Sequence, residues 1–503
     1  MKASRTLLFI LSVFILLGLA WFVFPEQGVA IGNTTLRFPS YAEDRLGPEQ
    51  ALDVDSVLDN VNKSYEMTVS GTLLDSLEFY RDYLTINPNR IHLPGNDYTY
   101  FDSLFYLLEH AQENQKIYRV MHYGDSQIEM DRITSVLRQR MQEMFGGSGP
   151  NMISAVKRIS SISLSQSYSG NLKRYALIGD STSYKASHSR YGVMTQFCQT
   201  NGTSSISFNR STHSQAYERV KEISTVSILI GNNSQGFRAS LKADPYQGEA
   251  KQYPANPGIT LITWKLPGSV GKGTITLQGS AEIYAVMLDG DYGVAVDNNA
   301  LRGCSGTIFT RIDKNLMRES FKAIDTRLII LQFGGNRMPS ITNSKQIGLY
   351  MNELDRQVKY FKEVAPQATF LFIGPADMGK SYNGKVTTWK GLPELNDSIK
   401  AMALRNDLAY WDMFHVMGGE GSMAQYVKHN PALAGPDYIH FTFLGAQEIG
   451  NDLAKSLIIY HDFYTLRKRL PAEMVEEFMT KDRELIEKEK EARKKQFVPT
   501  NYY

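Results

Sequence analysis

The feature that most constrains the fold is a series of short, unbroken apolar runs that alternate with segments of helical periodicity. The first strand is expected at Tyr118–Tyr123, and it precedes apolar residues that are spaced as on one face of a helix, from Ile133 to Met144. Short apolar runs bounded by turns are typical of buried parallel strands. The alternation therefore predicts an α/β domain built on a parallel sheet. The further strands are expected at Gly293–Val296, Leu328–Leu331, Thr369–Ile373 and Leu408–Trp411, and the helices between and after them at Gln346–Val364, Leu395–Leu404 and Leu444–Tyr460.

A segment of different composition interrupts this alternation. Residues 154–289 are rich in Ser, Gly, Tyr and Asn, and they show almost no helical periodicity. Short alternating runs with turn residues between them are typical of antiparallel strands. We therefore expect an inserted β-sandwich, which divides the α/β domain into residues 116–153 and 290–462. The strand signals of the insert are Ser204–Phe208, Val226–Ile230, Thr260–Trp264 and Thr274–Leu277.

The N-terminal residues 1–25 predict export. Lys2 and Arg5 precede the apolar run Leu7–Phe24, and this order places the body of the protein on the non-cytoplasmic side. The run is close to the length of about 20 residues that spans a bilayer, but small residues at two positions also resemble cleavage sites. Retention as an inner-membrane anchor and removal as a signal peptide both stay open. The predicted location is periplasmic or extracytoplasmic.

Two further segments lie outside the predicted domains. Residues 26–115 are predicted to form a stem or lead-in, with one amphipathic helix around Leu73–Leu84. Residues 463–503 are dense in alternating Lys, Arg and Glu, which is typical of a solvated helix, so they are predicted to form a charged helical tail without chemistry.

Composition excludes several classes of protein. The chain of 503 residues is too long for one compact core, and its formal net charge of +2 provides no basic field for nucleic acid. Cys198 and Cys304 are the only cysteines, which excludes a disulfide-rich scaffold and a cysteine-based zinc site. Whether these two thiols pair stays open. No metal-ligand cluster, phosphate loop or dinucleotide fingerprint occurs, so we expect neither a metal nor a cofactor.

Four polar blocks lie where the predicted strands end. In an open parallel sheet the carboxyl ends of the strands meet at one edge, so groups from distant blocks converge there. The blocks are Gly124-Asp125-Ser126 after the first strand, Arg302–Gly306 after the second, Gly334-Gly335-Asn336 after the third, and Asp437–His440 before the last helix.

In this order the blocks resemble those of the SGNH (GDSL-type) hydrolase superfamily, over about Tyr118–Asn151 and Asp289–Tyr460. Within it, the chain is most similar to bacterial peptidoglycan O-acetylesterases, in which a carbohydrate-binding-like sandwich interrupts the catalytic domain after its first helix. The resemblance implies a flavodoxin-like three-layer sandwich with an inserted, jelly-roll-like β-sandwich. The phrases His122–Asp131, Phe145–Pro150 and Met417–Met423 add to the likeness.

The residue types suit nucleophilic ester cleavage. A serine hydroxyl becomes a good nucleophile when an imidazole takes its proton, and a carboxylate orients and stabilises that imidazole. We therefore predict Ser126 as nucleophile, His440 as base and Asp437 as its partner. By resemblance, the oxyanion hole consists of the backbone N–H groups of Ser126 and Gly303 and the side-chain amide of Asn336.

Each of these residues also has an ordinary structural explanation. Ser126 and Glu129 match an S-x-x-E capping box, in which the serine would only cap the next helix. Gly303 and Gly306 match turn glycines, and the alignment of their block is the least secure. Arg337 stands where many superfamily members have aspartate. A second Gly-Asp-Ser triplet ends at Ser181, but no amphipathic helix follows it, so we reject Ser181 as the nucleophile.

The expected function is that of an exported serine esterase, which removes O-acetyl groups from an acetylated polysaccharide, with peptidoglycan as the first candidate. One alternative is an O-acetyltransferase that uses the same triad. Another is a non-catalytic surface protein that binds glycans through the insert. The insert carries aromatic residues that are able to stack on sugar rings, although in a β-sandwich such residues more often pack the core; they include Tyr168, Tyr184, Tyr246 and Trp264.

Overall fold

The computed structural model describes residues 29–31, 34–36, 73–157, 159–178, 182–248, 250–473, 475–476 and 479. The predicted export segment, Ser181 and most of the charged tail lie outside these residues. The chain divides into two compact units, Met1–Glu78 and Phe79–Tyr503. In the first unit, β1 (Val29–Ile31) pairs antiparallel with β2 (Thr34–Leu36). No helix within the described ranges is long and apolar enough to cross a membrane.

The second unit contains a mostly parallel sheet, which has six strands within the described residues, in the order β14-β4-β15-β16-β19-β3. Numbered along the chain, its five parallel strands lie in the spatial order 2-1-3-4-5, which is the flavodoxin-like order. The predicted α/β fold with a parallel sheet is confirmed. The strands are β4 (Ile117–Gly124), β14 (Gly293–Ala300), β15 (Thr326–Gln332), β16 (Thr369–Ile373), β19 (Ala409–Trp411) and β3 (Ile91–His92).

The edge strand β3 comes from the segment that the sequence predicts as a stem. Its residues Ile91 and His92 pair antiparallel with Trp411 and Tyr410 of β19. The neighbouring helix α5 (Asp102–Glu109) buries Phe105 and Leu108 in the same hydrophobic cluster as α12 (Phe443–Arg467). This part of the lead-in therefore extends the α/β domain.

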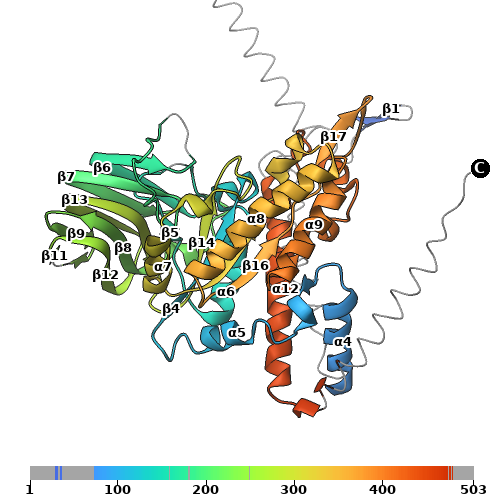
Figure 1. Cartoon of the computed structure of the whole chain (residues 1–503), viewed down its shortest axis with the longest axis horizontal. Coiled ribbons are helices and arrows are strands. Elements are labelled where there is room, and N and C mark those ends of the chain that lie inside the picture. The colour runs from blue at the N-terminus through green and yellow to red at the C-terminus, as the bar shows by residue number, and fades with distance from the viewer. Residues whose placement is uncertain are drawn as a thin grey trace, which may run out of the picture. The chain divides into compact units, whose positions relative to one another are not determined.

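Helices cover both faces of the parallel sheet (Figure 1). Along β15, Leu328 and Ile330 pack in one hydrophobic cluster, whereas Ile329 and Leu331 pack in another. This alternation follows from the two-residue period of a strand and makes the three-layer sandwich. The first cluster includes α5, α6 (Thr134–Phe145) and α12, and the second includes α7 (Lys314–Ala323), α8 (Ser344–Val364) and α9 (Leu392–Arg405).

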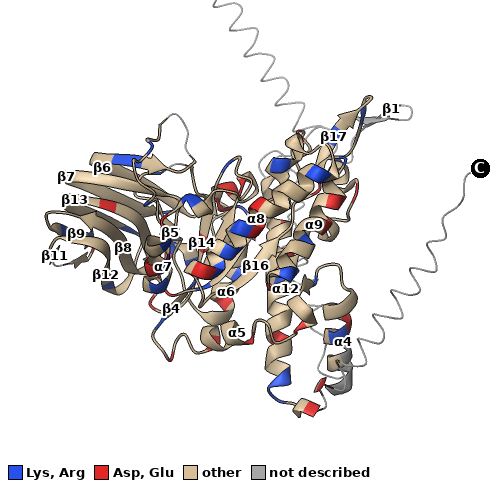
Figure 2. Ribbon diagram, viewed as in Figure 1, with Lys and Arg blue, Asp and Glu red and all other residues tan. Residues whose placement is uncertain are grey.

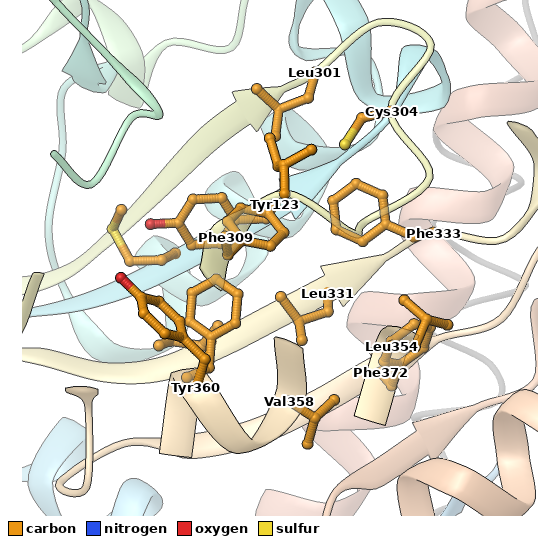
Figure 3. Close-up of a cluster of buried hydrophobic side chains, with 14 of the residues drawn as sticks. Tyr123, Leu301, Cys304, Phe309, Leu331, Phe333, Leu354, Val358, Tyr360 and Phe372 are labelled. Carbon is orange, nitrogen blue, oxygen red and sulfur yellow. The ribbon is translucent and has the colours of Figure 1, made fainter. Parts of the chain in front are cut away.

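The second of these clusters supports the loops at the carboxyl edge of the sheet. Figure 3 shows Tyr123 of β4, Phe309, Leu331 and Phe333 packed against α8. Phe333 directly precedes the Gly334-Gly335-Asn336 block, so its burial anchors that block. Burial of each such side chain contributes about 1.5–3 kcal/mol.

The two cysteines lie in different parts of the core. Cys304 packs in the cluster of Figure 3, and Cys198 packs in the core of the insert. Both side chains are buried and no disulfide joins them. They therefore contribute to packing in two separate places.

The insert lies between α6 and β14 and is an antiparallel sheet of nine strands in the part of the chain that the structure describes. The long strand β13 connects it: one edge of β13 pairs with β7 and β5, and the other pairs with β9 and then β8. The predicted inserted β domain is confirmed. Its strands are β5 (Asn151–Ile153), β6 (Leu164–Ala176), β7 (Gln196–Arg210), β8 (Ile223–Asn233), β9 (Phe237–Ala243), β10 (Tyr246–Gln247), β11 (Lys251–Tyr253), β12 (Asn256–Val270) and β13 (Lys272–Asp289).

The aromatic residues of the insert divide into two groups. Trp264 is buried in the insert core, and Tyr246 packs against that core. Tyr168 and Tyr184 are exposed. Trp264 is therefore not accessible to a ligand, whereas Tyr168 and Tyr184 are.

Three helices that flank the carboxyl edge begin at side-chain caps. Asp313, Asn343 and Thr442 accept hydrogen bonds from the first turns of α7, α8 and α12, which satisfies N–H groups that a helix leaves unpaired. The short helices α10 (Met413–Val416) and α11 (Ser422–Lys428) and the hairpin β17 (Gly379–Tyr382) and β18 (Lys385–Thr388) complete this edge. Acidic and basic residues lie interspersed along α8 and its neighbours (Figure 2), in keeping with the small net charge.

Candidate active site

The turn after β4 presents Ser126. A Cβ atom on Gly124 would lie 2.9 Å from Cδ1 of Ile128, so any larger residue there would require the Ile128 side chain to shift. The chain then enters the 3₁₀ helix η2 (Ser126–Asp131) before α6, so a short element separates the strand from the predicted helix. Asp125 caps η2 by accepting a hydrogen bond from the Gln127 N–H at 2.9 Å. The capping-box interpretation of Ser126 is wrong, because Asp125 is the cap.

The structure brings Ser126, His440 and Asp437 together in the order of a catalytic triad. Oγ of Ser126 lies 2.9 Å from Nε2 of His440, and Nδ1 of His440 lies 2.7 Å from Oδ2 of Asp437. The backbone N–H groups of Ile439 and His440 donate to Oδ1 of Asp437 at 3.0 and 3.1 Å. With a proton on Nδ1 donated to Asp437, Nε2 is free to accept the serine proton.

The electrostatics of Asp437 suit this arrangement. Burial by itself would raise the pKa of Asp437, but hydrogen bonds from the His440 side chain and from two backbone N–H groups outweigh it and lower the pKa. The carboxyl group is therefore ionised at neutral pH. The side chains of His440 and Asp437 are 40% and 48% exposed, so solvent reaches the base of the triad.

Asn336 reaches the same site from η5 (Gly335–Ser340). Its Nδ2 donates to Oδ2 of Asp125 at 2.8 Å and to the backbone oxygen of Cys304 at 3.3 Å. Both amide hydrogens are used in this conformation, so one of these bonds must be exchanged before Asn336 can donate to an oxyanion. Its place in the oxyanion hole stays a prediction.

Gly303 lies on an exposed loop with φ of +71° and is not among the residues that line the site. Its predicted role in the oxyanion hole therefore also stays a prediction. The same loop is held by Arg302, whose Nε and Nη2 each lie 2.6 Å from the carboxylate of Glu129. Gly306 has a φ of +77°, and a Cβ there would lie 2.8 Å from the Phe333 ring, so both the backbone and the packing at this position favour glycine.

A pocket of about 140 Å³ opens beside Ser126. Ser126, Gln127, Asn336 and His440 are on its polar side. Drug-sized ligand pockets are usually about 300–1,000 Å³, so this one accommodates a small group. Its apolar wall consists of Phe333, Pro339, Pro375, Ala376, Met378, Met413 and Ile439.

Sequence reasoning missed the residues that fasten the His440 loop to the Ser126 turn. Nε2 of Gln127 donates to the Ile439 oxygen at 2.6 Å. Arg132 donates to the Phe441 oxygen at 2.8 Å and to the Ser126 oxygen at 3.0 Å. Their closeness to Ser126 in sequence was the available signal, but their partners lie about three hundred residues away, where no spacing rule applies.

The buried carboxyl group of Asp125 should make the unfolding free energy depend on pH. Burial raises the pKa of this carboxyl from 3.8 to about 6, although the Gln127 N–H, His440 and Asn336 act to lower it. Because the folded-state pKa is the higher one, the stability that this group contributes is complete below the unfolded value and is lost as pH rises through about 6. The difference between the folded and unfolded pKa values of Asp125 corresponds to roughly 3 kcal/mol of unfolding free energy. In Asp125→Asn this loss should disappear.

The measurement is the free energy of unfolding in urea at about pH 4 and about pH 8, compared between variant and wild type. The difference between the two pH values should be smaller by up to about 3 kcal/mol in Asp125→Asn. Asp97→Asn changes an exposed aspartate and is the control, which should keep the wild-type difference. If the unfolding free energy of Asp125→Asn differs between the two pH values as much as that of the wild type, Asp125 is not the group responsible for the pH dependence.

Comparison with known proteins gives a family match that runs from the last strands of the insert through most of the second part of the α/β domain. Residues 268–447 match the model of the GDSL-like Lipase/Acylhydrolase family. The chain contains a GDSL-like acylhydrolase domain. The match includes Gly303, Asn336, Asp437 and His440, and Ser126 lies before it because the insert separates the two parts. The identification of an SGNH-type carboxylic ester hydrolase is confirmed.

The solved structures that are similar to the chain include one whose TM-score shows a shared fold. A peptidoglycan O-acetylesterase superposes with a TM-score of 0.57 at 19% identity, over 72% of this chain and 96% of that chain. A family two carbohydrate esterase from Cellvibrio japonicus has a TM-score of 0.22 at 10% identity, over 60% of this chain and 99% of that chain. An acetyl xylan esterase has a TM-score of 0.25 at 13% identity, over 32% of this chain and 79% of that chain. The search of curated proteins finds no match.

Proposed function

We propose that this acylhydrolase is an exported serine O-acetylesterase that acts on an acetylated polysaccharide, with O-acetylated peptidoglycan as its first substrate. The observation that carries the proposal is the contact chain from Ser126 through His440 to Asp437 at the mouth of a pocket of about 140 Å³. The pocket accommodates an acetyl group beside the serine oxygen, while the exposed side of the triad faces the sugar.

The contacts of the triad support a reaction in two halves. His440 Nε2 takes the hydroxyl proton of Ser126 as Oγ bonds to the acetyl carbon. The oxyanion of the tetrahedral intermediate then accepts hydrogen bonds from N–H groups. The bond to the sugar oxygen then breaks, His440 returns the proton to that oxygen, and the acetyl group remains on Ser126. A water molecule then gives a proton to His440 and attacks the acetyl carbon, the bond from that carbon to Ser126 Oγ breaks, and His440 returns the proton to Ser126 Oγ as acetate leaves. The ionised Asp437 stabilises the imidazolium in both halves.

Three observations support a polysaccharide substrate and a location outside the cytoplasm. The domain shares its fold with a protein named as a peptidoglycan O-acetylesterase. The insert interrupts the α/β domain directly after α6, which is where the resemblance to peptidoglycan O-acetylesterases predicts a carbohydrate-binding-like domain. The apolar run Leu7–Phe24 behind Lys2 and Arg5 supports export, with cleavage or anchoring of that segment as the remaining alternatives.

The test is release of free acetate from O-acetylated peptidoglycan and from acetylated xylan, measured side by side. We expect preferential release from peptidoglycan, with one acetate formed for each ester lost. Preference for xylan would refute the peptidoglycan assignment and keep the esterase. Loss of esters without free acetate, with transfer of acetyl to an added sugar, would show an acetyltransferase instead.

A further inference from the structure

We propose that the outer face of the β17–β18 hairpin binds carboxylate groups of the substrate polymer and thereby holds an acidic glycan beside the triad. This inference rests on the proposed function and names a chemical feature of its substrate. The hairpin projects from the α/β domain (Figure 1). We define the basic hairpin face by the side chains of Lys380, Tyr382, Lys385, Trp389 and Lys390.

The backbone attaches the hairpin to the loop of the catalytic histidine. The N–H of Gly379, the first residue of β17, donates to the backbone oxygen of Tyr438 at 2.8 Å. Tyr438 lies between Asp437 and His440 in the chain. A Cβ on Gly379 would lie 2.7 Å from Cβ of Tyr438, so the two segments are in direct contact. The hairpin is therefore packed against the loop that carries the base of the triad.

The other end of the hairpin is attached to the wall of the pocket beside Ser126. The N–H of Trp389, directly after β18, donates to the backbone oxygen of Met378 at 2.8 Å, and Met378 lines that pocket. Lys380 is two residues after Met378, so their Cα atoms are at most roughly 7 Å apart. A polymer chain whose ester lies at Ser126 is therefore able to contact the basic hairpin face as well.

The register of the hairpin separates its side chains into two faces. Tyr382 pairs with Lys385, and Lys380 lies two residues before Tyr382, so these three side chains share one face. Thr388 lies on the opposite face, where its hydroxyl accepts a hydrogen bond from the Gly421 N–H at 2.7 Å. That opposite face is turned to the domain, whereas Lys380 and Lys385 are exposed to solvent.

The basic hairpin face concentrates positive charge. Residues 378–393 include three lysines and no aspartate or glutamate. Within the residues that the structure describes, none of these three ammonium groups forms an ion pair. Lys359 of α8 differs, because it pairs with Asp355 of the same helix at 2.6 Å. The charge of the three hairpin lysines is therefore available to an anionic ligand.

Aromatic rings hold two of the ammonium groups in place. Nζ of Lys380 lies 4.4 Å from the ring centroid of Trp389 and 5.7 Å from that of Tyr382, and Nζ of Lys390 lies 5.4 Å from that of Tyr382. Such contacts restrict the lysines but provide no oxygen acceptor. An ammonium group has three donors and no acceptor, so the ligand should supply oxygen acceptors with negative charge. Carboxylates do so, and peptidoglycan carries them on its peptides.

The position of the basic hairpin face favours the substrate over an anionic membrane as its ligand. Both attachments of the hairpin are to parts of the candidate site, namely the loop that ends at His440 and the pocket wall at Met378. A ligand bound to this face lies next to the reacting ester, which is where the substrate polymer must lie.

The decisive variant combines Lys380→Gln, Lys385→Gln and Lys390→Gln. Two substrates are compared: soluble O-acetylated peptidoglycan fragments, and the same fragments after conversion of their carboxylates to amides. We expect the ratio of kcat/KM for the acidic fragments to kcat/KM for the amidated fragments to fall about fivefold to tenfold at low salt, because exposed ion pairs are lost. The fall should be smaller at about 0.5 M salt, which screens exposed charges.

The matched control combines Lys242→Gln, Lys265→Gln and Lys272→Gln. It replaces three exposed lysines of the insert and changes the net charge equally, so it should keep the wild-type ratio. An equal fall of the ratio in this control would show an effect of overall charge and would overturn the proposal.

A binding measurement separates this inference from the proposed function. The Ser126→Ala protein, with and without the three hairpin substitutions, is titrated calorimetrically with acidic peptidoglycan fragments from which the O-acetyl groups have been removed. Weaker binding by the hairpin variant supports the proposal even if peptidoglycan proves not to be hydrolysed. Equal affinities of the two proteins would overturn the proposal. Loss of sedimentation with phosphatidylglycerol vesicles in the hairpin variant would then show that the face contacts a membrane instead.

Discussion

Replacement of Ser126 by alanine is expected to lower kcat/KM for an aryl acetate on the order of 10,000-fold or more, because no other group can form the acyl intermediate. The hydroxyl oxygen lies 2.9 Å from His440 Nε2 and does not cap a helix, so its removal deletes the nucleophile. The unfolding free energy should change little, since Ser126 is only half-buried. Release of aryl alcohol by purified protein is the measurement.

The second Gly-Asp-Ser triplet provides the matched control. Ser181→Ala changes the same residue type in the same local sequence, and it should keep the wild-type rate. A second check is His440→Ala in the Ser126→Ala background, which should add almost no further loss because the two residues act as a unit. Full activity of Ser126→Ala, or its loss in Ser181→Ala, would contradict the assignment.

The parallel sheet was predictable because its strands are buried on both faces. Runs such as Leu328–Leu331 and Phe370–Ile373 are therefore continuously apolar, and each lies within an observed strand. Strand β3 was not predictable in this way. It is only two residues long, and its place depends on pairing with β19, more than three hundred residues later.

The contacts at the candidate site also divide into those that the sequence could predict and those that it could not. Ser126, Asp437 and His440 were predictable because they follow or precede regular elements whose ends must meet. The Arg302–Glu129 pair and the bond from Asn336 to Asp125 depend on side-chain directions between loops. Periodicity carries no information on such directions, so these contacts required the structure.

A buried charge network joins the insert to the parallel sheet. Arg119 of β4 contacts Asp289 at the end of β13 at 2.6 Å and Asp297 of β14 at 2.8 Å. All three side chains are 3% exposed or less. Asn151 donates to Asp289 at 3.0 Å, and the Met152 N–H donates to Asp297 at 2.8 Å. The network therefore fixes the first and last strands of the insert against β4 and β14.

Replacement of Arg119 by methionine is expected to lower the unfolding free energy by about 3–5 kcal/mol, because it leaves two carboxylates buried without their cation. Burial already raises the pKa of Asp297 to about 6 despite Arg119, so loss of the arginine should raise it further. Protonation of Asp297 at low pH then removes its uncompensated charge in Arg119→Met. The loss of unfolding free energy in this variant should therefore be smaller at about pH 4 than at about pH 8.

Urea unfolding at both pH values measures this effect, and two variants show whether charge or packing is responsible. Arg327→Met removes a half-exposed arginine that pairs with Asp325, and it should cost less than about 1 kcal/mol. Arg119→Met combined with Asp289→Asn and Asp297→Asn removes every charge of the network and should recover part of the loss. If the triple variant is no more stable than Arg119→Met, the side-chain packing of Arg119, and not its charge, holds the insert against the sheet.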